Sequence, residues 1–288
     1  MEAQAPTRSL VWRVRDRSLD LSRQTRIMGV VNVTPDSFSD GGQHDTPEAA
    51  IAHALRLHAE GADILDIGGE SSRPGAAPVS ADQEQARTVP VITALRNACP
   101  DALLSIDTTK AAVAHAALAA GAHIVNDISA GQADPEMLPL IAQTRAGLVL
   151  MHMRGTPGTM QDNPQYDNVT REVTDFLHAR AAAALAAGIA PDAIVLDPGI
   201  GFGKTLAHNL TLMRDLPLMA AELPFPFLLG VSRKRWLGAL TGRDVNDRLA
   251  ASLGGLAACI ERGAKIMRVH DVLFSCDVAK VIDRIYKN

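Results

Sequence analysis

The sequence predicts a single (β/α)8 barrel preceded by a short β-hairpin. The chain has 288 residues, of which 47% are hydrophobic and 21% charged, so it is long enough to bury a large core. From residue 27 onward, short apolar runs alternate with Ala- and Leu-rich stretches of helical period, as parallel strands joined by helices do. Polar residues follow nearly every run, whereas a doubly wound open sheet would gather them at one switch point. The barrel is therefore the favoured fold.

The hairpin is expected in the N-terminal segment. Residues 11–14 and 19–21 are short apolar runs that flank Arg15 to Ser18. The first 26 residues are rich in arginine, but no apolar segment of the kind found in secretory signals follows them. We expect residues 1–26 to form an N-terminal extension and residues 27–288 to form the catalytic barrel.

Eight apolar runs supply the expected strands of the barrel. They are residues 27–32, 64–68, 103–107, 124–127, 148–152, 194–197, 227–231 and 266–269. The first helix is expected to begin after Thr46, an N-cap candidate followed by Pro47, and to end at Gly61. Residues 172–187 and 247–262 follow the same pattern, because a glycine comes directly after each stretch.

Composition and charge point to a small-molecule partner. The net charge of −4 provides no basic surface for a phosphate backbone, so nucleic acid is not an expected partner. No apolar run approaches the roughly 20 residues needed to cross a bilayer, so no membrane association is expected. Cys99, Cys259 and Cys276 lack a CxxC spacing, which indicates neither a disulfide framework nor a zinc site and fits a reducing cytoplasm.

A glycine-rich segment, residues 199–205, resembles a phosphate-binding loop at first sight. It reads GIGFGKT, but Pro198 and Lys204 stand where the P-loop and the dinucleotide fingerprint need glycine. We interpret the segment as a flexible strand-to-helix loop. Its glycines could let the backbone approach a ligand closely.

Polar residues at the expected strand ends form the candidate site. Asp107, Asn126 and Asp197 end three strands, where buried carboxylates and amides are costly unless they are paired. A planar heterocycle with an amidine or guanidine edge would pair them, and internal hydrogen bonds within the barrel mouth are the alternative.

Arg268 and His270 end the last expected strand and lie two residues apart, which places both on one side. Such a pair suits a phosphate or pyrophosphate group, although Arg268 could instead form an ion pair with an acid such as Asp271. Residues 34–42 and 68–76 follow the first two strands as loops that could cover the same mouth or serve as surface turns.

These segments together resemble the dihydropteroate synthase family. The family's opening motif is matched by MGVVNVTPDSFSDGG at residues 28–42, and its second by GGESSRPG at residues 68–75. Further matches are SIDT at 105–108, ND at 126–127, MHM at 151–153, DPG at 197–199, SRK at 232–234 and RVHD at 268–271. The matches occur in family order over residues 27–271.

The resemblance implies an enzyme of folate biosynthesis. It implies a transferase that condenses 6-hydroxymethyl-7,8-dihydropterin pyrophosphate with 4-aminobenzoate, giving 7,8-dihydropteroate and pyrophosphate. It also implies Mg2+ as the cofactor, a cytoplasmic homodimer, and inhibition by sulfonamides.

The resemblance also carries over site residues by position. The pterin pocket is matched by Asp107, Asn126, Met151, Asp197, Phe202 and Lys234. The pyrophosphate site is matched by Asn32, Arg73, Arg268 and His270, and the metal site by Asn32 and Asp40. The aminobenzoate side is matched by Phe38, Ser72, Pro74 and Ser232. The residues expected to act in catalysis are Asp107, Asp197, Lys234, Arg268 and His270. Two departures are Ser72, where the family often has Thr, and Ile200, where an aromatic residue is common.

The chemistry explains these residue types. Pyrophosphate leaves readily only if cations meet its growing charge, a role expected of Arg268, His270 and Mg2+. Asp107 and Asp197 would stabilise positive charge spreading into the dihydropterin ring. Two alternatives are a pterin-binding methyltransferase domain, which needs no pyrophosphate pocket, and a catalytically inactive homologue, which should have lost several motif residues.

Overall fold

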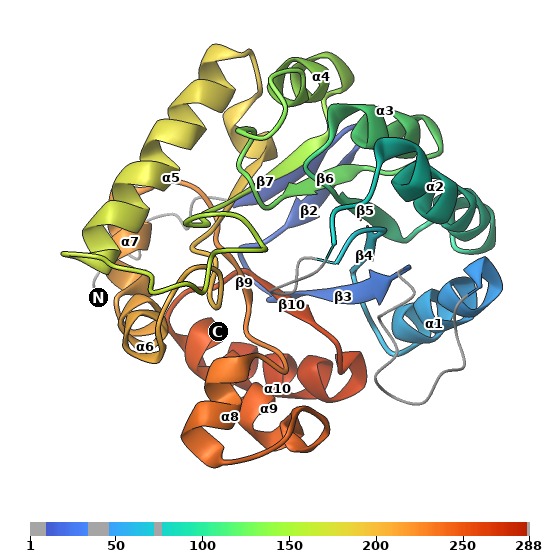
Figure 1. The fold of residues 1–288 in the computed structure, drawn as a ribbon. Helices are drawn as coiled ribbons and strands as arrows, with labels where there is room; N and C mark the ends of the chain where they lie inside the picture. Colours follow the sequence, from blue (N-terminus) through green and yellow to red (C-terminus); the bar gives the residue numbers. More distant parts are fainter. Residues whose placement is uncertain (1–9, 34–45, 72–76, 287–288) are drawn as a thin grey trace, which may run out of the picture.

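The protein forms a closed barrel of parallel strands surrounded by helices, as Figure 1 shows for the computed structural model, which describes residues 10–33, 46–71 and 77–286. The strands follow the order β8-β7-β6-β5-β4-β3-β10-β9. Their bounds are β3 Arg26–Asn32, β4 Ile64–Gly68, β5 Leu103–Asp107, β6 Ile124–Asp127, β7 Gly147–Met151, β8 Ile194–Asp197, β9 Leu228–Gly230 and β10 Ile266–Val269. A parallel bridge between Leu196 and Phe227 closes the barrel between β8 and β9. The predicted (β/α)8 fold is confirmed.

Three strands differ from the predicted bounds. β7 lies one residue earlier than predicted, so His152 follows the strand instead of ending it. β9 is only three residues long, because Phe227 forms an isolated bridge instead of a continuous ladder. β3 begins one residue earlier, at Arg26, which pairs with Ile266 of β10.

Helices cover the outer face of the strands. They are α1 Pro47–Ala59, α2 Ala81–Ala98, α3 Ala111–Ala119, α4 Met137–Thr144, α5 Val169–Ala186, α6 Leu206–Arg214, α7 Leu216–Glu222, α8 Arg235–Thr241, α9 Leu249–Glu261 and α10 Val272–Tyr286. Thr46 caps α1 by accepting a hydrogen bond from the Ala49 N–H, as predicted. α5 begins earlier than predicted because Asn168 caps it, and Val245–Asp247 form a separate 3-10 turn before α9.

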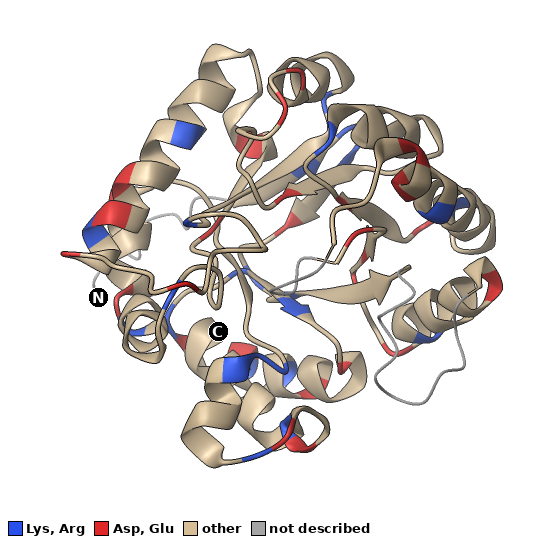
Figure 2. Cartoon of the chain, in the orientation of Figure 1, with Lys and Arg blue, Asp and Glu red and all other residues tan. Residues whose placement is uncertain are grey.

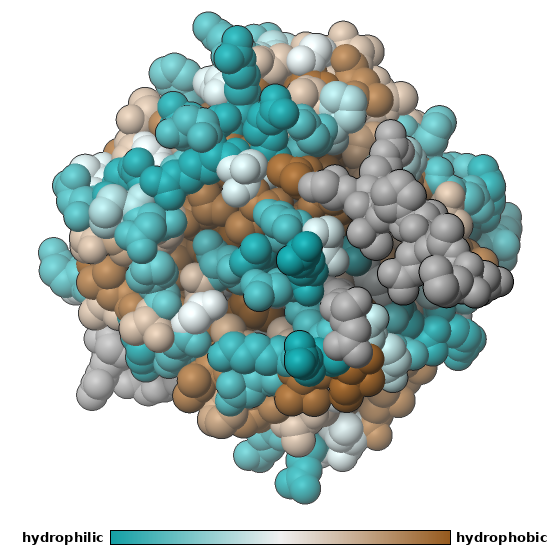
Figure 3. All heavy atoms as spheres, turned by 180° about the vertical axis from the view of Figure 1, so that it is seen from behind, coloured by the Kyte–Doolittle hydropathy of each residue, from teal (hydrophilic) through white to brown (hydrophobic). Residues whose placement is uncertain are grey.

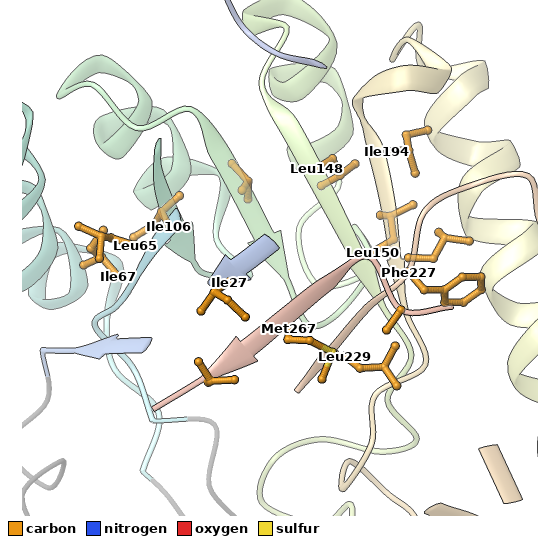
Figure 4. Close-up of a cluster of buried hydrophobic side chains, with 14 of the residues drawn as sticks. Ile27, Leu65, Ile67, Ile106, Leu148, Leu150, Ile194, Phe227, Leu229 and Met267 are labelled. Carbon is orange, nitrogen blue, oxygen red and sulfur yellow. The ribbon is translucent and has the colours of Figure 1, made fainter. Parts of the chain in front are cut away.

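Two apolar layers follow from the alternation of side chains along each strand. The outer layer lies between strands and helices, where Figure 4 shows Ile27, Leu65 and Leu148 among its buried side chains. The inner layer fills the inside of the barrel. It consists of the residues that alternate with the outer layer along each strand, such as Met28 next to Ile27 and Ile64 next to Leu65. The barrel is therefore a packed core, and its polar groups are left to the ends of the strands.

The hairpin closes the N-terminal end of the barrel. Its strands are β1 Val11–Val14 and β2 Arg17–Asp20, so the second strand begins two residues before the predicted run. Trp12 is fully buried in the inner layer, and its Nε1 donates a hydrogen bond of 2.9 Å to the Ala193 carbonyl. Gly147, the first residue of β7, allows the hairpin to pack this closely, since a Cβ at this position would lie 2.5 Å from Val14 Cγ1 of β1. The expected division of the chain at residue 26 stays a prediction.

Seen from behind, the surface mixes hydrophilic and hydrophobic side chains, as Figure 3 shows. Over the described part of the chain, no helix combines the length and the apolar character that crossing a membrane requires.

Candidate active site

A row of polar side chains crosses the carboxyl ends of the strands. The register aligns Asn32 with Gly68, Gly68 with Asp107 and Asp107 with Asn126, so these positions lie side by side on β3 to β6. Gly68 leaves room between its neighbours, since a Cβ there would lie 3.8 Å from Asp107 Oδ2 and 3.9 Å from Asn32 Oδ1. Figure 2 shows the resulting acidic segments on the central strands and a basic segment on β10. Asn32, Asp107 and Asn126 therefore lie together at one end of the barrel.

Arg268 joins this row to a buried acid that the sequence prediction missed. Its Nε donates to Asp66 Oδ2 at 2.6 Å, and its Nη2 donates to Asp107 Oδ2 at 2.7 Å. Asn126 Nδ2 donates to the same Asp66 oxygen at 3.0 Å. The other oxygen of Asp66 is buried and has no hydrogen-bond partner among the described residues. One carboxylate thus orients a residue matched to the pyrophosphate site and another matched to the pterin pocket.

The predicted alternative for Arg268 was an ion pair with a nearby acid such as Asp271. Arg268 does form ion pairs, but with Asp66 and Asp107. Asp271 instead contacts Arg233, with 2.6 Å between Arg233 Nη2 and Asp271 Oδ1. Arg268 reaches into the barrel because it lies on β10, whereas Asp271 follows the strand. Asp66 could have been found as the one acidic residue within an otherwise apolar strand.

The electrostatics of the Arg268 cluster favour a charged guanidinium. Burial raises the pKa of Asp107 well above its usual value, the Arg268 cation opposes this shift, and the Asp66 charge adds to it. Burial by itself lowers the pKa of Arg268, but the charges of Asp66 and Asp107 outweigh it and raise that pKa. Arg268 therefore stays cationic, while Asp107 holds its proton more readily than an exposed aspartate.

Asp197 ends β8 and Lys234 follows β9, which pairs with the strand β10 that carries Arg268, so both residues lie beside the Arg268 cluster. Asp197 Oδ1 accepts a 2.7 Å hydrogen bond from the Gly199 N–H, and burial raises its pKa to about 6 against that bond and the Lys234 charge. Burial and then the Arg268 charge lower the pKa of Lys234 to about 8. Lys234 Nζ also lies 4.1 Å from the centroid of the Phe202 ring. The three residues matched to the pterin pocket therefore lie together.

An apolar wall completes this part of the mouth. Met151 and Phe202, both matched to the pterin pocket, are buried in one cluster with Ile128 and Met160. A cavity of about 490 Å³ opens next to this wall and is lined by Asp107, Ile128, Ser129 and Met153, among others. Acids beside an apolar wall suit a flat, polar-edged ring.

His270 and Ser232 lie together at the neighbouring strand ends. His270 Nδ1 is 3.2 Å from Ser232 Oγ, and the His270 N–H donates to the same oxygen at 3.3 Å. The sequence matched His270 to the pyrophosphate and Ser232 to the aminobenzoate. Their contact places the two expected subsites next to each other.

Several expected site residues lie outside the described residues: Phe38, Asp40, Ser72, Arg73 and Pro74. Within the described ranges, no three His, Cys, Asp or Glu side chains gather as a metal site would require. Asn32 lies within the described residues, and its side-chain amide oxygen is a ligand of the type that Mg2+ binds.

Asp127, the second residue of the ND motif, turns away from the row of polar side chains. It accepts hydrogen bonds from Ser129 and from the Gly131 N–H and so holds its own loop. Its neighbour Asn126 faces the barrel interior, and successive side chains of a strand point to opposite faces.

Comparisons with known proteins find relatives over nearly the whole chain. The sequence model of a family described as pterin binding enzyme matches residues 28–270. A dihydropteroate synthase of Neisseria meningitidis serogroup C is 48% identical over 274 residues, covering 94% of this chain and 95% of the relative. The dihydropteroate synthase of Escherichia coli K12 is 42% identical over 266 residues, covering 92% of this chain and 93% of the relative. The structure of Xanthomonas albilineans dihydropteroate synthase with 4-aminobenzoic acid superposes with a TM-score of 0.90 at 46% identity, covering 98% of this chain and all of that one.

Proposed function

The chain belongs to the pterin-binding enzyme family, and on that premise we propose that the mouth described above performs the condensation that makes 7,8-dihydropteroate. Its function is that of the dihydropteroate synthases, transferases of folate synthesis. The observation that carries the site assignment is the meeting of Asp197, Lys234 and Phe202 beside the Arg268 cluster. A methyltransferase domain or an inactive homologue has no comparable support.

The pterin is proposed to bind between the acids and the apolar wall. Asp197 would accept hydrogen bonds from the amino-pyrimidine edge with the oxygen that Gly199 does not use. Lys234 would contact the ring from the side of Phe202, which it already approaches. Met151 would pack against the face of the ring.

The pyrophosphate is proposed to lie toward Arg268 and His270. The two contacts of Arg268 with Asp66 and Asp107 use Nε and Nη2, and Nη1 takes part in neither. Asn32 lies in the same row and would contribute a ligand to Mg2+, with Asp40 as the second expected ligand. When bound, the metal would neutralise charge on the leaving pyrophosphate. Mg2+ usually takes only one or two carboxylates besides substrate phosphates and water, so a sparse protein ligand set fits it.

The transfer step requires no protein nucleophile. The C–O bond of the methylene group breaks, and its electron pair leaves with the pyrophosphate that Arg268 and His270 hold. The amine nitrogen of 4-aminobenzoate forms the new C–N bond and releases one proton to water. Asp107 and Asp197 would stabilise positive charge on the dihydropterin ring.

The aminobenzoate is proposed to bind at Ser232, together with Phe38, Ser72 and Pro74, and Arg73 is the residue expected to bind the anion; these four residues lie outside the described ranges. One related structure, from Yersinia pestis, is a dihydropteroate synthase with a sulfonamide drug, with a TM-score of 0.92 at 41% identity. A sulfonamide should compete with 4-aminobenzoate here, because both present an aniline ring with an anionic group para to the amine. Inhibition that is noncompetitive with 4-aminobenzoate would contradict this placement.

The test of the activity is direct. The purified protein is incubated with dihydropterin pyrophosphate, 4-aminobenzoate and Mg2+, and dihydropteroate is detected by chromatography. Product must require both substrates and disappear with Arg268→Ala, whereas Asp127→Asn, on the same sheet but facing away, should retain activity. No product from the folded wild-type protein would reject the proposal.

The chain is also proposed to work as a homodimer in the cytoplasm. Phe274, Val281 and Ile285 lie on one face of α10 and are 49%, 58% and 59% exposed, which suits a partner surface. The three buried free cysteines fit a reducing compartment. Light scattering should give a dimer for the wild type and a monomer for Val281→Glu, while Leu218→Glu, an equally exposed position on α7, should remain a dimer. A wild-type monomer at micromolar concentration would contradict the assembly.

A further inference from the structure

Lys204 is a buried lysine that the proposed reaction does not use. It lies in the loop between β8 and α6 and is only 3% exposed. Its Nζ donates hydrogen bonds of 2.9 Å to the carbonyls of Gly199 and Phe202 and contacts His152 Nδ1 at 2.9 Å. The His152 carbonyl lies 3.3 Å from the same Nζ, so four acceptors surround the three N–H donors of the ammonium group.

These contacts join two loops at the mouth. His152 directly follows β7, whereas Gly199 and Phe202 follow β8. The two loops approach so closely that a Cβ at Gly199 would collide with the His152 carbonyl, and a Cβ at Gly203 would lie 2.5 Å from the Arg154 carbonyl. Both glycines have positive φ, +68° and +60°, so the loop needs glycine for two reasons. The amine of Lys204 fills the polar centre of this junction.

The junction lies directly behind residues of the proposed pterin pocket. Gly199, whose carbonyl accepts from Lys204, donates its N–H to Asp197 Oδ1 at 2.7 Å. Phe202, whose carbonyl also accepts from Lys204, forms the wall that Lys234 approaches. His152 follows Met151, the other wall residue. Lys204 thus contacts the backbone next to Asp197 and next to both residues of the apolar wall, Met151 and Phe202.

We propose that Lys204 is a positioning residue of the pterin pocket. Its amine joins the loops that follow β7 and β8, and its positive charge stabilises the ionised carboxylate of Asp197 without touching the ligand. This inference rests on the proposed pterin site and adds a residue to it that does not touch the ligand. A solely structural lysine would stabilise the fold without changing the ionisation of Asp197. The two roles therefore differ in what they predict for binding as a function of pH.

The charges around the two groups are compatible with this role. The pKa of Asp197 is raised by burial and lowered by the Gly199 N–H and by three cations from separate elements: Lys234, Lys204 and Arg268. Burial lowers the pKa of Lys204 to about 7, Asp197 opposes this shift, and Lys234 and Arg154 add to it. Burial and the Lys204 charge lower the pKa of His152 to about 2, so His152 stays neutral and can accept at Nδ1. Removing the Lys204 charge should make Asp197 harder to ionise.

The experiment compares Lys204→Met with the wild type at several pH values. Binding of 6-hydroxymethylpterin is followed by its fluorescence, and the aminobenzoate KM is measured at saturating dihydropterin pyrophosphate. We expect Lys204→Met to raise the pterin Kd about tenfold or more at neutral pH, or about 1.4 kcal/mol, because Asp197 becomes harder to ionise and the two loops lose the amine that joins them. The acid limb of pterin binding should move to higher pH, and the aminobenzoate KM should change less than about twofold.

Two further variants separate the explanations. Leu95→Ala, which opens a cavity at a fully buried position of α2, controls for loss of stability and should leave the pterin Kd and its pH profile unchanged. If Lys204→Met does not fold, Lys204→Gln provides the same readout with two donors kept and the charge removed. A pterin Kd and an acid limb equal to those of the wild type in either folded variant would overturn the role of Lys204. Unchanged pterin binding by Asp197→Ala would instead reject the pterin site itself, and this inference with it.

Discussion

Replacing Asp66 by asparagine should weaken catalysis more than it weakens the fold. The change removes the negative charge of the Asp66 carboxylate. Its Oδ2 atom accepts hydrogen bonds from Arg268 Nε at 2.6 Å and from Asn126 Nδ2 at 3.0 Å. Arg268 keeps its second contact, to Asp107 at 2.7 Å, so its guanidinium remains paired at one end only. The arginine then loses the contact that fixes its direction.

The cost to stability follows from the burial of the pair. Removing one partner of a buried ion pair typically costs about 3–5 kcal/mol. Two features reduce that figure for Asp66: Arg268 retains Asp107, and the second oxygen of Asp66 is already buried without a partner among the described residues. We expect a loss of about 2 kcal/mol in the free energy of unfolding, or a Tm lower by about 4–6 °C. The loss in kcat/KM should be larger, about 100-fold, because a displacement of about 1 Å in a positioning group has effects of that size.

The assay pairs calorimetric melting with steady-state kinetics at 25 °C, where both variants remain folded. Asp127→Asn is the matched control, since Asp127 is also a fully buried aspartate but contacts only its own loop. Asp127→Asn should lower Tm with little change in kcat/KM. If Asp66→Asn and Asp127→Asn lose activity in the same proportion to their loss of stability, then Asp66 does not orient Arg268 and the reasoning is refuted.

Three other predictions follow from the same structure. Asp197→Ala should weaken pterin binding by at least ~2 kcal/mol, about 30-fold in Kd, because a charge-assisted hydrogen bond is lost; titration calorimetry on the folded variant checks this, and an unchanged Kd contradicts it. Burial raises the pKa of Asp197 from 3.8 to about 6, so pterin affinity should fall as the pH drops below about 6. The ligand-free protein should lose stability as the pH rises from 3.8 to about 6, because the folded state binds the Asp197 proton more tightly than the unfolded state does. Titrations at pH 5 and 7.5 that give equal affinity would count against an ionised Asp197 in the complex. Trp12→Ala should cost about 3–5 kcal/mol and lower Tm without changing kcat at 25 °C, since Trp12 packs at the barrel end opposite the site; an unchanged Tm would mean that the hairpin does not stabilise the barrel.

The sequence predicted the barrel because its signals are local. Five strands have the predicted bounds, since apolar runs between helical stretches mark buried parallel strands clearly. The short strand β9 was overestimated because its pairing depends on where the barrel closes, at Leu196 and Phe227, and no local pattern reports that closure. The shift of β7 by one residue had a consequence for the site: His152 lies in a loop, where it meets Lys204.

The partners of the site residues were harder to predict than the residues themselves. Arg268 was expected near an acid, but its partner Asp66 is 202 positions away in the sequence. That contact follows from the register of β10, β3 and β4 around the barrel, which spacing along the chain does not contain. Lys204 was interpreted only as a residue that breaks a phosphate-loop motif, and its role became visible once the carbonyls around it were placed.

The balance of charge at the mouth explains why the substrate should bring its own cation. The charged groups discussed above for the proposed pterin pocket include three acids and three bases, namely Asp66, Asp107, Asp197, Lys204, Lys234 and Arg268. Each base already faces at least one of the acids, so this set has little surplus positive charge for a pyrophosphate. A buried, balanced set stays stable without ligand, because unpaired buried charge is costly. Arg268 alone therefore does not balance the added negative charge of the pyrophosphate, and we propose that Mg2+ at Asn32, the neighbouring His270 and Arg73 supply the remainder.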